Sequence, residues 1–321
     1  MVYEAFLETV KSSLRERLGD GFTLTVQSVR KNNGLTLDGL CIGKKNEKAA
    51  PTIYLNSFYE AFRNGKPLPG ILADIMALYQ NSRLPDDFHF DELLSTDQIR
   101  DKIIYRLINE TANRELLEDV PHFSYPDLDL CLVFCLSFLK SEDNLLTALI
   151  HSQHLKTWNL STEELYTAAM TNTPRLFPAR IRSLPEVIKD IAGKSADKEL
   201  AEEAFHEFFD QVPLSPPMYV LTNSTGMNGA GCMFYEGILK DFAACIGSDL
   251  IILPSSIHEV LILPYSREIS FEELADTVFS INQEEVPEED RLSNHIYFYS
   301  RERNGLYIAF TSSVPIGTEN P

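Results

Sequence analysis

The segment from Pro217 to Pro264 constrains the fold more than any other part of the chain, because it alternates short strand patterns with one helix pattern. MYVLT and AGCMFY flank a glycine-rich turn and predict a hairpin, and EGILKDFAACI predicts a helix that ends at Gly247. DLIIL and HEVLIL then predict two further strands around the corner PSSIHE. Strands this short and this close in sequence favour antiparallel pairing.

Similar hairpin patterns recur along the rest of the chain. Residues 22–42 alternate around Asn33-Gly34, and a change of apolar phase at Gly39 predicts a bulge. Residues 128–150 predict a second hairpin, and the last two strands turn around Asn304-Gly305. Because these hairpins are joined to helices and do not follow strict βαβ alternation, we predict the α+β class, with antiparallel sheets covered by helices.

Serine residues mark the starts of two predicted helices. Ser161 and Ser270 are each followed three residues later by a glutamate, the spacing of a capping box. A further helix is predicted at 196–211. The order strand, turn, strand, helix occurs at 128–170 and again at 218–246, which raises the hypothesis of a duplicated unit.

A chain of 321 residues suits one large domain or two of moderate size. Residues 81–98 are polar and carry no periodic pattern, so they predict a surface connection. We therefore expect an N-terminal domain at 1–96, with a first helix, a small sheet and helices. A larger α+β domain is expected at 97–321.

The formal net charge of −19 restricts the partners of this chain. A protein this acidic is repelled by nucleic-acid backbones and by anionic membrane surfaces. Its apolar runs are too short to span a bilayer, and Glu4 and Glu8 stand where a secretion signal would be basic. Five cysteines without CxxC spacing favour free thiols. We expect a cytoplasmic protein.

The corner PSSIHE contains the candidate catalytic residues Ser255, Ser256, His258 and Glu259. In an extended chain, Ser256 and His258 share one face about 7 Å apart, whereas Glu259 points to the opposite face. A serine-histidine hydrogen bond would then need a bend at the serines, and no GxSxG elbow precedes them. The pattern therefore favours a structural corner, with a catalytic site as the alternative.

Three arginines form a basic group in this acidic chain. Arg175, Arg180 and Arg182 lie among three prolines, which predict a loop over residues 174–185. Guanidinium groups bind carboxylates and phosphates in a bidentate manner, so these arginines are candidates for anion binding. Salt bridges to the chain's own acidic residues are the alternative.

No motif in the sequence predicts a metal or a cofactor. His151 and His154 lie three residues apart but lack the HExxH spacing of a zinc site. The glycines of STGMNGAG, at 224–231, lack the spacing of a phosphate-binding loop. We therefore expect neither a metal nor a cofactor.

Several blocks of sequence are distinctive, at 31–40, 51–62, 101–109, 115–122, 171–175, 218–223 and 254–264. Together they resemble an uncharacterised family of clostridial bacterial proteins, domain of unknown function 5688. The likeness extends over nearly the whole chain. Because that family has no established activity, fold or cofactor, the resemblance implies no site residues.

Three hypotheses about function remain open at this stage. The first is a non-enzymatic binding or adaptor protein whose partner is an unknown protein or a small anionic ligand, because each candidate catalytic set fails on spacing. The second is an enzyme that acts on a small anionic substrate, with the PSSIHE corner lining a cleft and the arginines holding the anion. The third is an acidic mimic of nucleic acid.

Overall fold

The computed structural model describes residues 1–44, 50–82, 99–141, 144–193, 216–311 and 316. The chain divides into two compact units, Met1–Ser95 (unit 1) and Thr96–Pro321 (unit 2). Every strand pair in the described part of the chain is antiparallel, and helices accompany the sheets in both units. The predicted α+β class is therefore confirmed.

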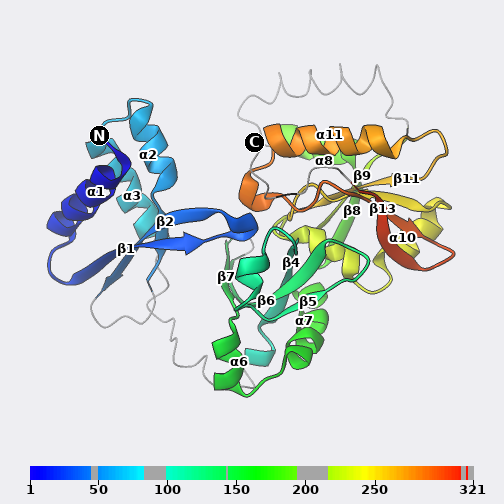
Figure 1. Cartoon of the computed structure of the whole chain (residues 1–321), viewed down its shortest axis with the longest axis horizontal. Coiled ribbons are helices and arrows are strands. Elements are labelled where there is room, and N and C mark those ends of the chain that lie inside the picture. Colours follow the sequence, from blue (N-terminus) through cyan, green and yellow to red (C-terminus); the bar gives the residue numbers. More distant parts are fainter. Residues whose placement is uncertain (45–49, 83–98, 142–143, 194–215, 312–315, 317–321) are drawn as a thin grey trace. The chain divides into compact units, whose positions relative to one another are not determined.

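The described residues of unit 1 form a three-stranded sheet, three α-helices and one short 3-10 helix (Figure 1). Its elements are α1 (Tyr3–Leu18), β1 (Phe22–Arg30), the short 3-10 helix η1 (Asn32–Gly34), β2 (Thr36–Lys44), β3 (Thr52–Tyr54), α2 (Asn56–Arg63) and α3 (Leu68–Ser82). The strand order is β1-β2-β3. A core of large apolar side chains joins the sheet to the helices, and it includes Phe6, Val10, Leu14, Leu40, Ile42, Ile71 and Ile75.

The hairpin predicted around Asn33-Gly34 is present, but the bulge predicted at Gly39 is wrong. Asn33 and Gly34 adopt positive φ angles of 60° and 76°, as a tight reversal requires. The register between β1 and β2 is continuous through Gly39, which lies opposite Gln27. A Cβ atom at Gly39 would lie 2.4 Å from Thr52 Cγ2, so the glycine allows β3 to approach closely.

Two sheets are present in the described residues of unit 2. The four-stranded sheet comprises β4 (Ile103–Asn109), β5 (His122–Ser124), β6 (Leu130–Ser141) and β7 (Asn144–Leu149), and both β5 and β7 pair with β6. The six-stranded sheet has the order β13-β12-β10-β11-β9-β8. Its strands are β8 (Ala179–Ser183), β9 (Tyr219–Asn223), β10 (Leu250–Leu253), β11 (Val260–Pro264), β12 (Ile296–Ser300) and β13 (Gly305–Phe310).

Short and long helices connect these strands. They are α5 (Arg114–Leu117), α6 (Ser152–Trp158), α7 (Thr162–Leu176), α8 (Leu184–Gly193), η3 (Gly229–Phe234), α10 (Ile238–Ile246), α11 (Phe271–Glu284) and η4 (Glu288–Asp290). Both predicted serine caps are confirmed, because the Ser161 and Ser270 hydroxyls accept hydrogen bonds from the third helical amide. The helix predicted to end at Gly247 is confirmed as α10, and Gly247 is left-handed there.

The six-stranded sheet lies between two layers of unit 2 (Figure 1). One of its faces shares the main core with the four-stranded sheet, η3, α7 and α10. This core includes Tyr105, Leu132, Phe134, Leu165, Leu221, Met233, Leu239, Ile252, Ile262 and Tyr297. The other face is covered by α11, whose Ala275 and Val278 belong to a smaller cluster with Ile251, Leu263 and Ile296.

Helix α7 completes the backbone hydrogen bonding of strand β4. The Asn172 side-chain amide donates to the carbonyl oxygens of Arg100 and Ile103, at 2.8 and 3.0 Å. The Thr173 hydroxyl accepts from the amide of Tyr105 at 3.0 Å. Because β4 is the first strand of its sheet, these contacts satisfy groups that an edge strand would otherwise leave open.

Two predictions about the middle of the chain are wrong. Residues 229–234 form the 3-10 helix η3 and not a strand, so 218–246 lacks the second strand of the hypothetical duplicated unit. The reason is close packing: a Cβ atom at Gly231 would lie 2.8 Å from the Tyr105 ring. The predicted loop at 174–185 is instead the end of α7 followed by β8 and the start of α8.

Some sequence predictions cannot be compared with structure. The predicted helix at 196–211 lies outside the described residues, as does most of the predicted connection at 81–98. All five cysteines are described and none forms a disulfide, although Cys245 is exposed whereas Cys131, Cys135 and Cys232 are buried. Among the helices that can be described, none is long and apolar enough to cross a membrane.

Candidate functional site

The PSSIHE corner, residues 254–259, connects β10 to β11 and is bent at its serines. The Ser256 hydroxyl accepts a hydrogen bond from the His258 amide at 3.0 Å, which closes a serine turn. The end of η4 and the segment after it run alongside the corner: Ile257 N–H donates to Asp290 O at 2.8 Å, and Leu292 N–H donates to Ser255 O at 3.0 Å. The corner is therefore anchored by backbone bonds and does not continue the extended geometry of the strands.

His258 is held from two sides. Its Nδ1 atom accepts a hydrogen bond from the backbone N–H of Asn228 at 3.2 Å. An accepting Nδ1 leaves the ring proton on Nε2, which lies 3.3 Å from Asp290 Oδ1. The histidine and the aspartate are half-buried, with about 30% and 26% of their side chains exposed. Both ring nitrogens thus have structural partners.

Glu259 follows this turn, so the straight-strand geometry from which it was expected to point away from Ser256 and His258 is absent. Because the chain bends at the serines, the alternation that holds in a straight strand does not apply. Burial raises the pKa of the Glu259 carboxyl, and the negative charge of Asp290 acts in the same direction. The neighbouring His258 and Ser256 side chains act in the opposite direction and lower the same pKa.

The loop before η3 supplies the partners of His258. Asn223 Oδ1 accepts from the amides of Thr225 and Gly226, both at 2.9 Å, and so shapes the loop. Asn228 is left-handed with φ of 53°, and its Oδ1 accepts from Arg106 Nε at 3.1 Å. The turn-forming residues of NSTGMNG, at 223–229, predict a loop here. Nothing in the sequence predicts that this loop contacts the PSSIHE corner.

The loop, the corner and the segment after η4 meet at the end of the central strands. The Thr222 hydroxyl, on β9, donates to the His258 carbonyl at 2.8 Å. A Cβ atom at Gly229 would lie 2.6 Å from the same carbonyl oxygen and 2.2 Å from Thr222 Oγ1. The site therefore has no room for a side chain at residue 229.

The three candidate arginines do not converge. Arg175 is exposed on α7 and donates to Asn172 Oδ1 at 3.2 Å. Arg180 and Arg182 are two residues apart on β8 and therefore lie on the same face of the strand. Arg182 forms an ion pair with Asp190 of α8. Arg180 is exposed and lies opposite Thr222 in the register, which makes it the candidate arginine nearest to the corner by strand pairing.

A second polar cluster, which the sequence did not reveal, surrounds Asp129. This carboxylate accepts hydrogen bonds from the Tyr297 hydroxyl at 2.5 Å and from the Ser293 hydroxyl at 2.8 Å. Asn109 Nδ2 donates to the same carboxylate at 2.8 Å, and His295 Nε2 lies 3.8 Å away. Because Asn109 ends β4 and Tyr297 belongs to β12, Asp129 joins the two sheets of unit 2.

The paired histidines have local roles. His154 Nδ1 accepts from the His151 amide at 2.9 Å, and the His154 ring stacks on Trp158. His151 Nδ1 lies 2.7 Å from Asp119. Within the described ranges, no three His, Cys, Asp or Glu side chains form a group that could hold a metal ion.

Comparison with known proteins gives one match. A family model described as a family of unknown function, DUF5688, matches residues 3–301. No curated protein and no solved structure matches the chain.

Proposed function

Since the chain belongs to this family of unknown function, DUF5688, we propose from geometry that it is a non-enzymatic binding or adaptor protein for a basic protein partner. One observation carries the non-enzymatic part: both nitrogens of His258 are engaged in holding loops together. A general base needs a ring nitrogen that is free to take a proton from a substrate. A proton on Nδ1 would point at the Asn228 N–H, so two hydrogen-bond donors would face each other and the bond between them would be lost.

The serines of the corner also favour a structural role. Ser256 is 5% exposed, and its oxygen accepts the His258 amide. A nucleophilic serine must instead present its oxygen to a substrate and give its proton to a base. Ser255 contributes its carbonyl oxygen to the segment after η4. The corner is thus explained as a joint that aligns three chain segments.

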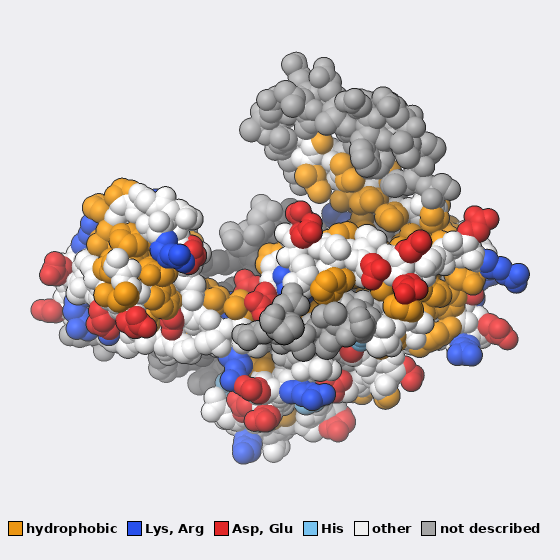
Figure 2. Space-filling view, turned by 45° about the horizontal axis from the view of Figure 1, so that its top comes forward, with side chains coloured by type: hydrophobic (Ala, Val, Ile, Leu, Met, Phe, Trp, Pro, Cys, Tyr) orange, Lys and Arg blue, Asp and Glu red, His pale blue; other side chains and the backbone are white. Residues whose placement is uncertain are grey.

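The choice of partner rests on the surface of α11. Five exposed carboxylates lie on this helix or at its C-cap: Glu272, Glu273, Asp276, Glu284 and Glu285. In the described part of the chain, none of these carboxylates has a hydrogen-bond or ion-pair partner. Figure 2 turns the α11 side of unit 2 toward the viewer, and acidic side chains in red are spread over it. Ile281, 42% exposed, adds an apolar contact within this acidic surface.

An acidic helix with an exposed isoleucine suits a partner with basic side chains around an apolar pocket. Opposite charges would speed association and fix orientation, while the apolar contact would supply affinity. A nucleic-acid backbone would be repelled by the same carboxylates.

The test compares two charge-reversed proteins. Asp276, Glu284 and Glu285 on α11 are changed to lysine in one, and the exposed Glu4, Glu8 and Glu16 on α1 are changed to lysine in the other, so the net charge changes equally. A protein retained by the wild-type chain is identified and purified. Its Kd is then measured for the wild type, the α11 variant and the α1 variant. We expect the α11 variant to bind at least about tenfold more weakly, a loss of about 1.4 kcal/mol, with the α1 variant nearly unchanged. Equal weakening of both variants would contradict the proposed surface.

A second candidate function, an enzyme that acts on a small anionic substrate, is favoured by one specific observation. The Glu259 carboxyl has a raised pKa because of burial, and it lies beside His258, as a general acid would. Glu259→Gln and His258→Asn are compared with wild type on panels of phosphate and carboxylate esters. Turnover by the wild type that both folded variants lose would replace the binding hypothesis with this one.

A further inference from the structure

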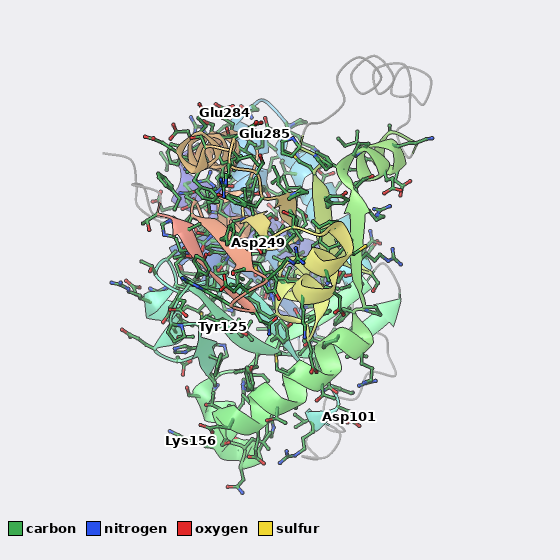
Figure 3. All side chains as sticks on the ribbon, turned by 90° about the vertical axis from the view of Figure 1, so that its right-hand side faces the viewer. Asp101, Tyr125, Lys156, Asp249, Glu284 and Glu285 are labelled. Carbon is green, nitrogen blue, oxygen red and sulfur yellow. The ribbon has the colours of Figure 1, made fainter. Side chains whose placement is uncertain are left out.

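We propose that a groove between α10 and the β12–β13 turn binds a small organic ammonium ion. The groove has a volume of about 370 Å³ and is formed by residues 233–237 and 239–241 together with Tyr299, Asn304, Gly305 and Leu306. This volume lies near the lower end of the range for small-molecule sites, about 300–1,000 Å³. Figure 3 faces this side of the molecule, and Asp249 is labelled between α10 and the β12–β13 pair.

The apolar part of the groove is packed against the main core of unit 2. Met233 and Leu239 are buried beneath it, 3% and 5% exposed. The Phe234 ring is stacked on Tyr125, with centroids 4.0 Å apart and planes 11° from parallel. Leu306 adds a half-buried aliphatic side chain. A short alkyl chain would therefore meet a preformed surface and would order few side chains on binding.

The polar part of the groove carries two carboxylates and one ammonium group. Glu236 and Asp241 line it and are exposed, and neither carboxylate has a hydrogen-bond or ion-pair partner among the residues that the structure describes. Asp241 Oδ2 lies so close to the backbone that a Cβ atom at Gly237 would be 3.1 Å from it. Lys240 also lines the groove but is exposed at its rim. The lining thus has a net negative charge.

The Tyr299 hydroxyl decides which kind of ligand fits. It is nearly buried and donates its proton to Asn304 Oδ1 at 2.6 Å. Burial raises the Tyr299 pKa, and the carboxylates of Asp241 and Asp249 raise it further, so the hydroxyl keeps this proton at neutral pH. The lone pairs that remain on its oxygen can only accept.

Two carboxylates and an accepting hydroxyl call for a cationic donor of hydrogen bonds. An ammonium group carries three N–H donors and a full positive charge, and its alkyl chain suits the apolar floor. An anion would meet Glu236 and Asp241 with like charge. A divalent metal would need a set of ligands that the described side chains do not assemble here.

The probe is hexylammonium, which like the lysine ammonium is charged at pH 7. Its Kd is measured by ligand-observed NMR titration, with hexan-1-ol as the neutral control of equal length and hexanoate as the anionic control. We expect hexylammonium to bind at least about tenfold more tightly than hexan-1-ol, because the charge-assisted hydrogen bonds are absent from the alcohol. Equal affinity for the alcohol, or no hexylammonium binding at millimolar concentration, would overturn the proposal.

Two variants locate the site. Asp241→Asn should weaken hexylammonium binding about tenfold, and its matched control, Asp276→Asn on α11, should leave the Kd unchanged. Tyr299→Phe should weaken hexylammonium binding, and a retained cooperative unfolding transition shows that this variant is still folded. Equal effects of the two aspartate variants would show general charge attraction and would reject the site. This proposal is independent of the α11 interface, since the α11 charge reversal should leave hexylammonium binding intact.

Discussion

The backbone amide of Asn228 donates a hydrogen bond to Nδ1 of His258 at 3.2 Å, and this contact connects two segments that are thirty residues apart. It also determines the tautomer, because a nitrogen that accepts carries no proton. The Nε2 proton then faces Asp290. The most prominent histidine of the sequence thus contacts both the loop before η3 and the last residue of η4.

Replacing His258 should lower stability in a graded way. His258→Ala removes both contacts and leaves the Asn228 amide without its acceptor, so we expect a loss of about 1–3 kcal/mol in the free energy of unfolding. His258→Asn should recover part of this loss, since its Oδ1 can take the place of Nδ1. Urea unfolding followed by tryptophan fluorescence measures the difference, because Trp158 of unit 2 is the single tryptophan of the chain. Equal stability of His258→Ala and wild type would contradict a structural role.

Removing the Tyr297 hydroxyl should destabilise unit 2. Tyr297 is fully buried and donates to Asp129, so Tyr297→Phe leaves the carboxylate with one donor fewer. We expect a loss of about 1.5–3 kcal/mol, the range for hydrogen bonds to charged groups. Tyr265→Phe is the matched control, since Tyr265 is 38% exposed and should change stability by less than about 0.5 kcal/mol. Similar losses in both variants would argue against the Asp129 cluster.

Adding one methyl group at Gly229 should disturb the junction of loop and corner. The new Cβ would overlap Thr222 Oγ1 and the His258 carbonyl, and backbone atoms cannot move aside cheaply. We expect Gly229→Ala to cost about 1–3 kcal/mol, as overpacking does in well-packed cores. Gly193→Ala, where no atom lies within 4 Å of the added carbon, should be neutral or slightly stabilising in α8. Thermal unfolding of both variants tests the comparison.

The Glu259 carboxyl should make stability depend on pH in a defined direction. Its folded-state pKa is raised above the ordinary value of 4.5, so the folded protein binds this proton more tightly than the unfolded chain does. The resulting stabilisation is fully present below the ordinary pKa and is lost as pH rises through the folded-state pKa.

Glu259→Gln removes this titration. The difference in unfolding free energy between the variant and wild type should therefore shift in favour of the variant as pH rises from 4 to 7. Glu272→Gln, at an exposed position on α11, should show no such trend. Urea unfolding across this pH range measures both differences, and a constant difference for Glu259→Gln would contradict the raised pKa.

Local patterns were sufficient for most of the fold. Asn33-Gly34 and Asn304-Gly305 predicted their hairpins because positive φ angles cost little at these residue types, and Asn33, Gly34 and Asn304 adopt them. Ser161 and Ser270 predicted helix starts because a cap needs only the next three residues. Residues 229–234 were misread as a strand because their apolar letters do not reveal that Gly231 lies against Tyr105.

The sequence by itself determined the antiparallel α+β class, the caps, the hairpin turns and the acidic charge, since each depends on residues a few positions apart or on composition. Only the tertiary structure decided that Glu259 joins His258, that Asp290 and Asn228 hold the histidine, and that Asp129 links the two sheets. These contacts join segments up to 168 positions apart. Their geometry arises from the packing of the sheets, which no local pattern encodes.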